Sequence, residues 1–559
     1  MKRLLVFLFL SIIFSQCIAV KSKKTTFVTT ENTIELSDDF KRPKLMIGIV
    51  VDQMRYDYLI KFYNKYGNNG FKRLMSNGYN LENVHYNYIP TYTAVGHASI
   101  YTGTTPTNHG IISNDWYDKY EKRSVYCVDD IRYETVGAKT GGKKSPQKML
   151  TTTILDQLRL AQNMKGKSIG ISIKDRSAIL PAGHTANAAY WFEGGNEGKF
   201  ISSTFYMNEL PNWVTNFNNS GKANDYLNKT WDTYFDINTY TESLTDNNKF
   251  EGLFNGKETP TFPYNLAELR KENNNYSLLK AIPFGNSIVT DFAEATILGE
   301  NLGKGDFTDF LAISYSSTDY IGHQFGVNAI ELEDTYIRMD KEIERLLLFL
   351  DNQIGSNNYT LFLTADHAVV EVPAYLNSLK IPGGYFNNSE FKETLDKITI
   401  ENFNSNEIIE NVSNYQIYLN KEKLKELKLN VHNVSQIIAD EIINIDNVYK
   451  SITALSLQSS NFNFGILKTL QNGYNQKFSG DILFVPNPST ISHNKTGTSH
   501  GSGYSYDTHV PLIFYGNRIK KGQSDKYYPI IDIAPTITSF LKITQASGNT
   551  GKPIIEVLK

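Results

Sequence analysis

Short runs of apolar, largely β-branched residues recur along this chain, and they limit its possible folds more than any other feature. The first run covers residues 45–51 and ends at Asp52. A run of this kind is typical of a strand buried on both faces of a parallel sheet. The pattern returns at residues 169–173, 310–313, 361–363 and 512–514. We therefore expect a central sheet of buried strands.

Helical patterns separate these runs. Residues 145–146 suit a helix cap and first turn, with Leu150, Ile154 and Leu158 on one face, and a second helix is expected at 331–350. Strands that alternate with helices predict an α/β fold with a mainly parallel central sheet flanked by helices. Such sheets bind ligands beyond the carboxyl ends of their strands.

Two segments, 195–285 and 372–490, interrupt this alternation. The first is rich in Trp, Tyr, Asn and Gly, and the second contains a helix-like stretch at 434–443. We expect both to be inserted cap segments that add no strand to the sheet. Together with the alternating pattern they would form one catalytic domain at 41–559.

The amino-terminal residues have the pattern of an export signal. Lys2 and Arg3 precede an apolar run at 4–14, and small residues follow it. This pattern predicts a signal peptide at 1–19, followed by a polar linker at 20–40. A membrane anchor would need about 20 apolar residues, more than this run supplies.

The cysteines limit the cellular compartments in which the protein is expected, and the charge balance limits its expected binding partners. Cys17 suggests a lipoprotein as an alternative, but residues 14–16 match that signal poorly, and Cys127 alone cannot form a disulfide within the mature chain. We expect a periplasmic or secreted monomer without a membrane span. With 56 basic and 58 acidic residues, the net charge of -2 gives no field that would attract nucleic acid.

Aspartate and histidine residues gather near the ends of the predicted strands. A single aspartate there is more often a helix cap than a ligand, so the argument rests on the set. Asp319 and His323 are four residues apart, which places both on one face of a helical turn. Carboxylate oxygen and neutral imidazole are good zinc donors, and the set is large enough for about two ions. The set is Asp52, Asp319, His323, Asp366, His367 and His500.

Thr93 is the candidate nucleophile. It lies in P-T-Y-T-A-V-G-H, where a helix is expected to begin, so backbone amides would face an incoming phosphate. A threonine hydroxyl is a poor nucleophile in water, and coordination to a metal would lower its pKa. Thr93 would then also be a metal ligand.

A set of motifs in this order resembles the alkaline phosphatase superfamily. They are V-D-Q-M-R-Y-D-Y-L, P-T-Y-T-A-V-G-H, H-G-I-I-S-N-D-W, I-K-D-R, S-T-D-Y-I-G-H, T-A-D-H and G-T-S-H-G-S-G-Y. The chain is most similar to the PafA-type alkaline phosphatases, which are relatives of the type I phosphodiesterase/nucleotide pyrophosphatases. The resemblance extends from about Lys44 to residues 532–536. It departs at Ala368, where a glycine is common.

The resemblance implies a role for each site residue. One zinc would be held by Asp319, His323 and His500, and the other by Asp52, Asp366 and His367, with Thr93 beside the second. Asn114, Lys174 and Arg176 would contact the phosphoryl oxygens. His509 is a rival to His500, which the resemblance favours because it stands in the glycine-rich loop. His97 and His109 are expected to form hydrogen bonds within the fold.

These expectations favour a phosphomonoesterase that releases phosphate through a phosphothreonine. A phosphodiesterase or nucleotide pyrophosphatase is the alternative, but Lys174 and Arg176 suit the second charge of a monoester. A sulfatase would need a cysteine where Thr93 stands. A non-catalytic binding protein would be expected to lose a ligand or the nucleophile, and none is lost.

Overall fold

A ten-stranded sheet forms the centre of the computed structural model, which describes residues 41–559. The predicted signal peptide, the linker and Cys17 lie outside the described residues. From edge to edge the strands are β20 (Gly522–Pro529), β2 (Tyr79–His85), β19 (His509–Gly516), β12 (Tyr359–Thr364), β1 (Leu45–Val51), β11 (Asp309–Tyr315), β6 (Ser168–Ser172), β7 (Ala188–Glu193), β8 (Lys199–Ser203) and β5 (Thr135–Val136).

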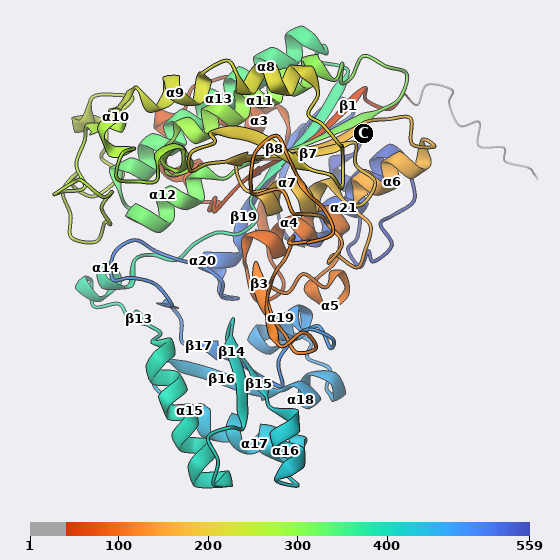
Figure 1. Cartoon of the computed structure of the whole chain (residues 1–559). Coiled ribbons are helices and arrows are strands. Elements are labelled where there is room, and N and C mark those ends of the chain that lie inside the picture. Colours follow the sequence, from red (N-terminus) through yellow and green to blue (C-terminus); the bar gives the residue numbers. More distant parts are fainter. Residues whose placement is uncertain (1–40) are drawn as a thin grey trace, which may run out of the picture. The chain divides into compact units, whose positions relative to one another are not determined.

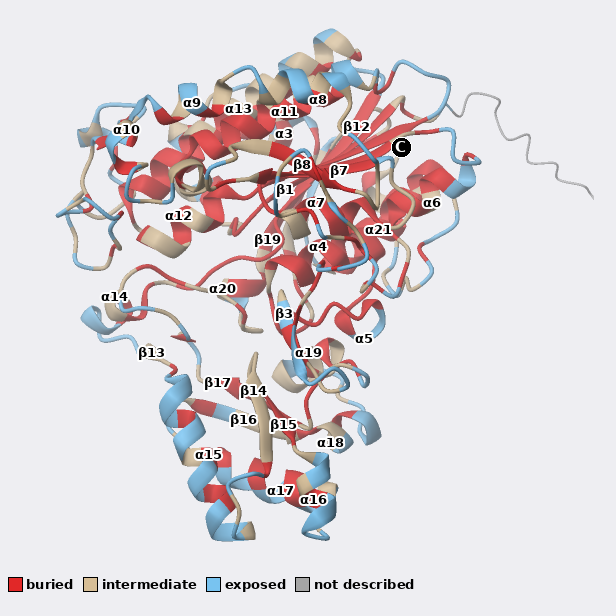
Figure 2. Ribbon diagram, in the orientation of Figure 1, coloured by how far each residue is buried: buried red, intermediate tan, exposed pale blue. Residues whose placement is uncertain are grey.

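The five central strands, β12, β1, β11, β6 and β7, are parallel. All five predicted runs are strands, and those in β1, β6, β11 and β12 are fully buried (Figure 2). The expected direction is wrong for the last run, because β19 is antiparallel to both β12 and β2. An apolar run shows that a strand is buried, but it is the same for either direction.

Helices cover both faces of the sheet (Figure 1). One layer contains α11 (Phe284–Gly299), α12 (Ser317–Phe325) and α13 (Ile330–Gln353), which pack on one another. The other contains α4 (Thr93–Thr102), α6 (Ile154–Ala161), α7 (Asp175–Ala182) and α21 (Ile533–Leu541). The helix expected at 331–350 is confirmed as α13. No helix within 41–559 has both the length and the apolar character of a membrane span.

The helix start expected at residues 145–146 is wrong, because α6 begins only at Ile154. Thr153 and Asp156 form a capping box, in which each side chain accepts a hydrogen bond from the other's backbone amide. The Ser145 hydroxyl instead donates to Asp130 at 2.6 Å. Leu150 consequently precedes the helix and is 53% exposed.

Both interrupting segments contain strands, and our expectation that neither adds a strand to the central sheet is wrong for the first segment only. The first includes β8, which pairs with β7 in the main sheet. The second forms a separate four-stranded sheet in the order β14 (Ile409–Ser413), β15 (Gln416–Leu419), β17 (Ile482–Pro486) and β16 (Val448–Thr453). This small sheet shares an apolar core with α15 (Asn388–Phe403) and α17 (Val431–Ile442), the helix expected at 434–443.

Candidate active site

The first group of candidate ligands lies where two adjacent parallel strands end. Asp52 follows β1 directly, and Asp366 and His367 lie just after β12. One ligand atom from each residue lies within 4.8 Å of the other two. His367 Nε2 is 3.5 Å from Asp52 Oδ1 and 3.6 Å from Asp366 Oδ2, and all three side chains are fully buried.

One atom of each residue in this group has no hydrogen-bond partner within residues 41–559. These atoms, Asp52 Oδ1, Asp366 Oδ2 and His367 Nε2, are all buried. A buried polar atom without a partner is costly, so three of them facing one another fit a bound cation. His367 Nδ1 donates to the Ala368 carbonyl at 3.0 Å, which leaves Nε2 as the free lone pair. The donor set is one that zinc prefers.

The second group of candidate ligands contains one aspartate and two histidines. Asp319 and His323 lie on α12, which follows β11, and His500 comes from a loop. The Nε2 atoms of His323 and His500 are 3.1 and 3.6 Å from Asp319 Oδ1. Each Nδ1 donates to a carbonyl, that of Thr498 at 2.8 Å and that of Thr91 at 2.7 Å. Both imidazoles therefore present Nε2 to the aspartate.

Lys174 joins the two groups. Its Nζ donates to Asp52 Oδ2 at 2.8 Å and to Asp319 Oδ2 at 2.6 Å. Burial alone would lower the pKa of Lys174, but Asp319 and Asp52 raise it above the usual value, so the group stays an ammonium. The rings of His367 and His500 stack with centroids 3.4 Å apart. The two groups are thus parts of one site.

The protonation states of three ligands suit metal coordination, whereas burial and Asp366 raise the pKa of Asp52, and Asp319 outweighs burial and raises the pKa of His323. Burial lowers the pKa of His367, and burial together with His367 lowers the pKa of His500 well below its usual value. Burial would raise the pKa of Asp366, yet His367 and His97 hold it below the usual value. Neutral imidazoles beside a carboxylate are the forms that bind metal.

The turn that contains Thr93 contacts both groups. Thr93 is buried and is the first residue of α4. Its carbonyl accepts a hydrogen bond from His97 Nδ1 at 2.8 Å, and the same nitrogen lies 3.4 Å from Asp366 Oδ2. Two residues before Thr93, the carbonyl of Thr91 holds His500. The start of α4 is therefore fixed between the two groups.

Gly96 allows this close contact. A Cβ atom at Gly96 would lie 2.1 Å from the carbonyl oxygen of Asp366, closer than any real contact. The helix that begins at Thr93 can therefore lie directly against the backbone at Asp366 only because residue 96 has no side chain.

Asn114 and Arg176 present free donors. Asn114 Oδ1 accepts the amide of Ala94 in the first turn of α4 at 2.9 Å, so the opposite end of the side chain, Nδ2, points away from that amide. Arg176 follows β6, and its Nη1 donates to the Tyr126 hydroxyl at 3.0 Å. Its Nε is buried and has no partner within the described part of the chain. A buried cationic donor of this kind suits an anionic ligand.

A comparison with family models gives a match over most of the chain. Residues 46–510 match the family described as type I phosphodiesterase / nucleotide pyrophosphatase. This chain belongs to that family.

Within the family, the chain is similar to alkaline phosphatases. Alkaline phosphatase PafA of Elizabethkingia meningoseptica is 44% identical over 521 residues, which cover 92% of this chain and 95% of that protein. Alkaline phosphatase PhoV of Synechococcus elongatus is 44% identical over 519 residues, or 93% of each. The crystal structure of wild-type PafA matches with a TM-score of 0.90 at 43% identity, covering 93% of this chain and 100% of PafA. The chain is thus an enzyme of the alkaline phosphatase class with the α/β fold of PafA.

Some residues of this family member escaped the sequence analysis. Gln53 has a positive φ of 64° directly after Asp52, and its side chain donates to Asp319 Oδ1 at 2.7 Å. Its backbone amide donates to Asp366 Oδ1 at 3.2 Å, so one residue orients a ligand in each group. Gly322 leaves room for it, since a Cβ there would lie 1.8 Å from Gln53 Oε1. The only signal was the place of Gln53 beside Asp52.

The sequence analysis also did not identify the residues that hold the Arg176 side chain in place. The Tyr126 hydroxyl, which accepts from Arg176, donates to Asp175 Oδ1 at 2.6 Å. Lys144 forms an ion pair with Asp175 at 3.2 Å. The guanidinium is thus fixed by a chain of polar contacts that begins in β4 (Arg123–Tyr126).

The other histidines stay outside the two ligand groups. His97 contacts Ser314 Oγ at 2.9 Å, and His109 contacts Ser99 Oγ at 2.9 Å, so both form hydrogen bonds within the fold as expected. His509 contacts the Glu82 carbonyl at 2.8 Å instead of joining Asp319. Ala368 is buried and has no positive φ, so alanine needs no strained turn there.

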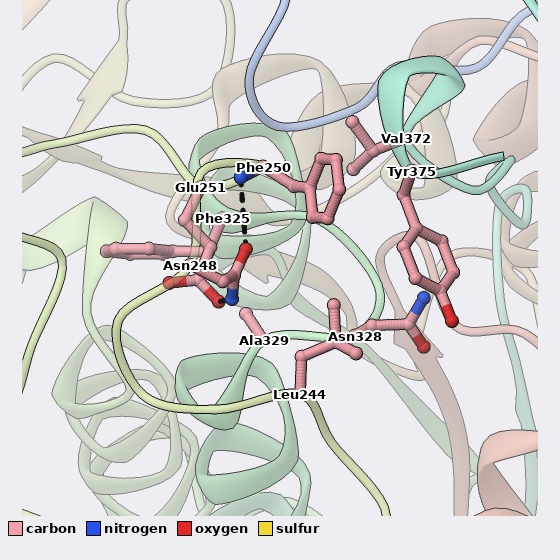
Figure 3. Close-up of a pocket in the computed structure, with 9 residues that line it drawn as sticks. All are labelled: Leu244, Asn248, Phe250, Glu251, Phe325, Asn328, Ala329, Val372 and Tyr375. Atoms are coloured by element: carbon pink, nitrogen blue, oxygen red, sulfur yellow. Dashed lines mark hydrogen bonds between the residues drawn. The ribbon is translucent and has the colours of Figure 1, made fainter. Parts of the chain in front are cut away.

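The end of α12 rests on a loop at 244–252. Figure 3 shows Phe325 of this helix, Glu251 and Asn248 around a small cavity of about 10 Å³, room for one water. Asn248 Oδ1 accepts the Phe250 amide at 3.0 Å, and the amide of Gly252 donates to the Gln324 carbonyl at 2.8 Å. This loop therefore supports the helix that bears Asp319 and His323.

Proposed function

We propose that this alkaline phosphatase relative is an exported phosphomonoesterase that uses two zinc ions and a phosphothreonine intermediate. The observation that carries the proposal is the arrangement of two ligand groups on either side of the turn that bears Thr93, one of which has three buried ligand atoms without a hydrogen-bond partner in the described part of the chain. Each group contains the nitrogen and oxygen donors of a zinc site.

The ligand assignment follows the two groups. Asp319, His323 and His500 would hold one ion, and Asp52, Asp366 and His367 the other. Thr93 Oγ would add a ligand to the ion at Asp52. Zinc in these positions would supply Lewis acidity, which would lower the pKa of the threonine hydroxyl and stabilise the leaving oxygen. The chain's own residues then orient the phosphoryl group.

Thr93 Oγ attacks phosphorus in line, and water later hydrolyses the phosphothreonine. Asn114 Nδ2, the Lys174 ammonium and the Arg176 guanidinium would donate to the non-bridging oxygens, where charge is concentrated. Asn114 is aimed by its bond to Ala94, and Arg176 by its bond to Tyr126. Two cations match the two charges of a monoester.

Export and a monomeric state complete the proposal. The positively charged start and the apolar run at 4–14 support export to the periplasm or the medium. All six candidate ligands come from one chain, so the proposed site is complete within a single subunit, and we propose a monomer. We further propose that parts of 195–285 and 372–490 are insertions into a single catalytic domain at 41–559.

A phosphodiesterase or nucleotide pyrophosphatase is the second candidate. The matched family model carries that description, and the proposed metals and nucleophile would serve either reaction. A diester has one negative charge and an extra substituent, so it makes less use of Lys174 and Arg176.

The deciding experiment measures kcat/KM for a chromogenic monoester and a matched diester, with and without a chelator, followed by addition of zinc. We expect the monoester to be preferred, activity to vanish with the chelator, and zinc to restore it. A preference for the diester would favour the second candidate. Full activity in a verified metal-free sample would refute the metal site.

A further inference from the structure

A polar pocket lies beside the second ligand group. Its volume is about 620 Å³, and its walls are residues 385–389 and 492–495. The two walls are joined, since Asn388 Nδ2 donates to Ser492 Oγ at 2.9 Å and the Tyr385 hydroxyl donates to the Lys495 carbonyl at 3.0 Å. The pocket is therefore a built feature, within the size range of small-molecule sites.

His493 connects this pocket to the ligand group. Its Nε2 donates to the carbonyl of His323 at 3.1 Å, and the two rings lie 5.8 Å apart. The His323 side chain is 30% exposed, whereas those of Asp319 and His500 are only 5% exposed. The group thus meets solvent at His323, next to the pocket wall.

The pocket carries a positive charge and no negative one. Lys495 is the only lysine or arginine among the nine lining residues, and no carboxylate is among them. The remaining side chains are mostly amides and hydroxyls, which bind polar groups.

We infer that this pocket is a subsite for the leaving group, and that Lys495 favours monoesters whose leaving group bears a second anionic group. The inference rests on the proposed function, in which Thr93 attacks in line beside Asp52, Asp366 and His367. In-line displacement then places the leaving oxygen on the opposite side, at Asp319, His323 and His500. The exposed edge at His323, which His493 joins to the pocket wall, is the route by which a leaving group on that side would enter the pocket. Lys495 is a specificity-determining residue and takes no part in bond breaking.

The test compares 4-carboxyphenyl phosphate with 4-carbamoylphenyl phosphate, which differ in charge but hardly in size. Lys495→Ala should lower kcat/KM for the carboxylate about threefold to fivefold, the size of a partly exposed ion pair, and leave the amide unchanged. Lys495→Glu should enlarge the difference, because attraction becomes repulsion. High salt should reduce the preference of the wild type.

Lys425→Ala is the matched control, since it removes an exposed lysine from the small sheet's α16 (Lys421–Glu426). It should leave the ratio of the two substrates at the wild-type value. An equal effect of Lys495→Ala on both substrates, or no effect on either, would overturn the inference. Absence of activity on both substrates in the wild type would instead refute the proposed phosphatase reaction.

Discussion

Thr93 is held by its backbone, so its side chain can be changed without moving the site. Thr93→Ala should lower monoester turnover by orders of magnitude, because the oxygen that we propose as the nucleophile is lost while His97 still bonds the carbonyl of residue 93. Thr93→Ser should keep part of the activity. Rapid-quench labelling should detect a phosphoryl-enzyme in the wild type and none in the alanine variant. Turnover near the wild-type value would assign the attack to another group.

Tyr126 should position Arg176 through its hydroxyl. Tyr126→Phe removes the oxygen that joins Arg176 to Asp175, so monoester kcat/KM should fall about tenfold, the loss expected for a disturbed donor. Bound zinc should not change. The control is Tyr133→Phe, on a tyrosine that packs against Phe205. A Tyr126→Phe enzyme that loses zinc would show that the hydroxyl supports the whole site.

Candidate metal ligands could be predicted from the sequence because aspartate and histidine are residue types that commonly bind metal. The six aspartates and histidines stand at strand ends and in motifs, and the structure brings them together in the two expected sets. Gln53 and Tyr126 could not be found this way, because glutamine and tyrosine are common in many roles. Their importance depends on contacts such as that of Gln53 with Asp319, 266 residues away.

The contact of α4 with the end of β12 is the element-level feature on which the site depends. Gly96→Ala should push the helix away from the Asp366 carbonyl and cost about 1–3 kcal/mol of stability, as overpacking usually does. The loss of kcat should be larger than the fraction of unfolded protein explains, since Thr93 moves with the helix. Chemical denaturation measures the change in stability, and a kinetic assay of the folded enzyme measures the change in kcat.

Gly305→Ala is the control for that substitution, because a Cβ at Gly305 meets no atom within 4 Å. Its stability and kcat should match the wild type. If Gly96→Ala also behaved like the wild type, α4 and β12 would have to be far less rigidly joined than their contact indicates.

Elements were predictable where a local pattern decides them. Buried strands and the long helix α13 follow from apolar periodicity. The start of α6 did not, because the serine and proline at 145–146 carry the same local signal as a helix start, whereas the helix begins after the capping box of Thr153 and Asp156. Strand direction and the small sheet depend on pairing between distant segments, which periodicity does not record.

For the molecule as a whole, Glu251 should make stability depend on pH. Burial and the nearby Glu331 raise the pKa of Glu251 to about 10, above its usual value of 4.5. Between these values the native state holds a proton that the unfolded chain has released, so stability falls as pH rises. Glu251→Gln keeps an acceptor for Asn248 and removes this dependence.

The melting temperature of Glu251→Gln relative to the wild type should therefore rise by about 3 °C or more between pH 5 and pH 9. Glu258→Gln, at an exposed position near the same loop, should show no such trend. A constant difference between Glu251→Gln and the wild type would mean that Glu251 is ionised in the native protein across this range.

The spread of the site along the chain also has a consequence for biogenesis. The six candidate ligands extend from Asp52 to His500, and the parallel strands that position them are joined by crossovers. During synthesis, a nascent chain that has not yet released His500 lacks a member of one ligand set, however well its earlier strands have paired. Catalytic activity should thus appear late in folding. A pulse-chase assay could follow that activity to measure when newly made chains finish folding.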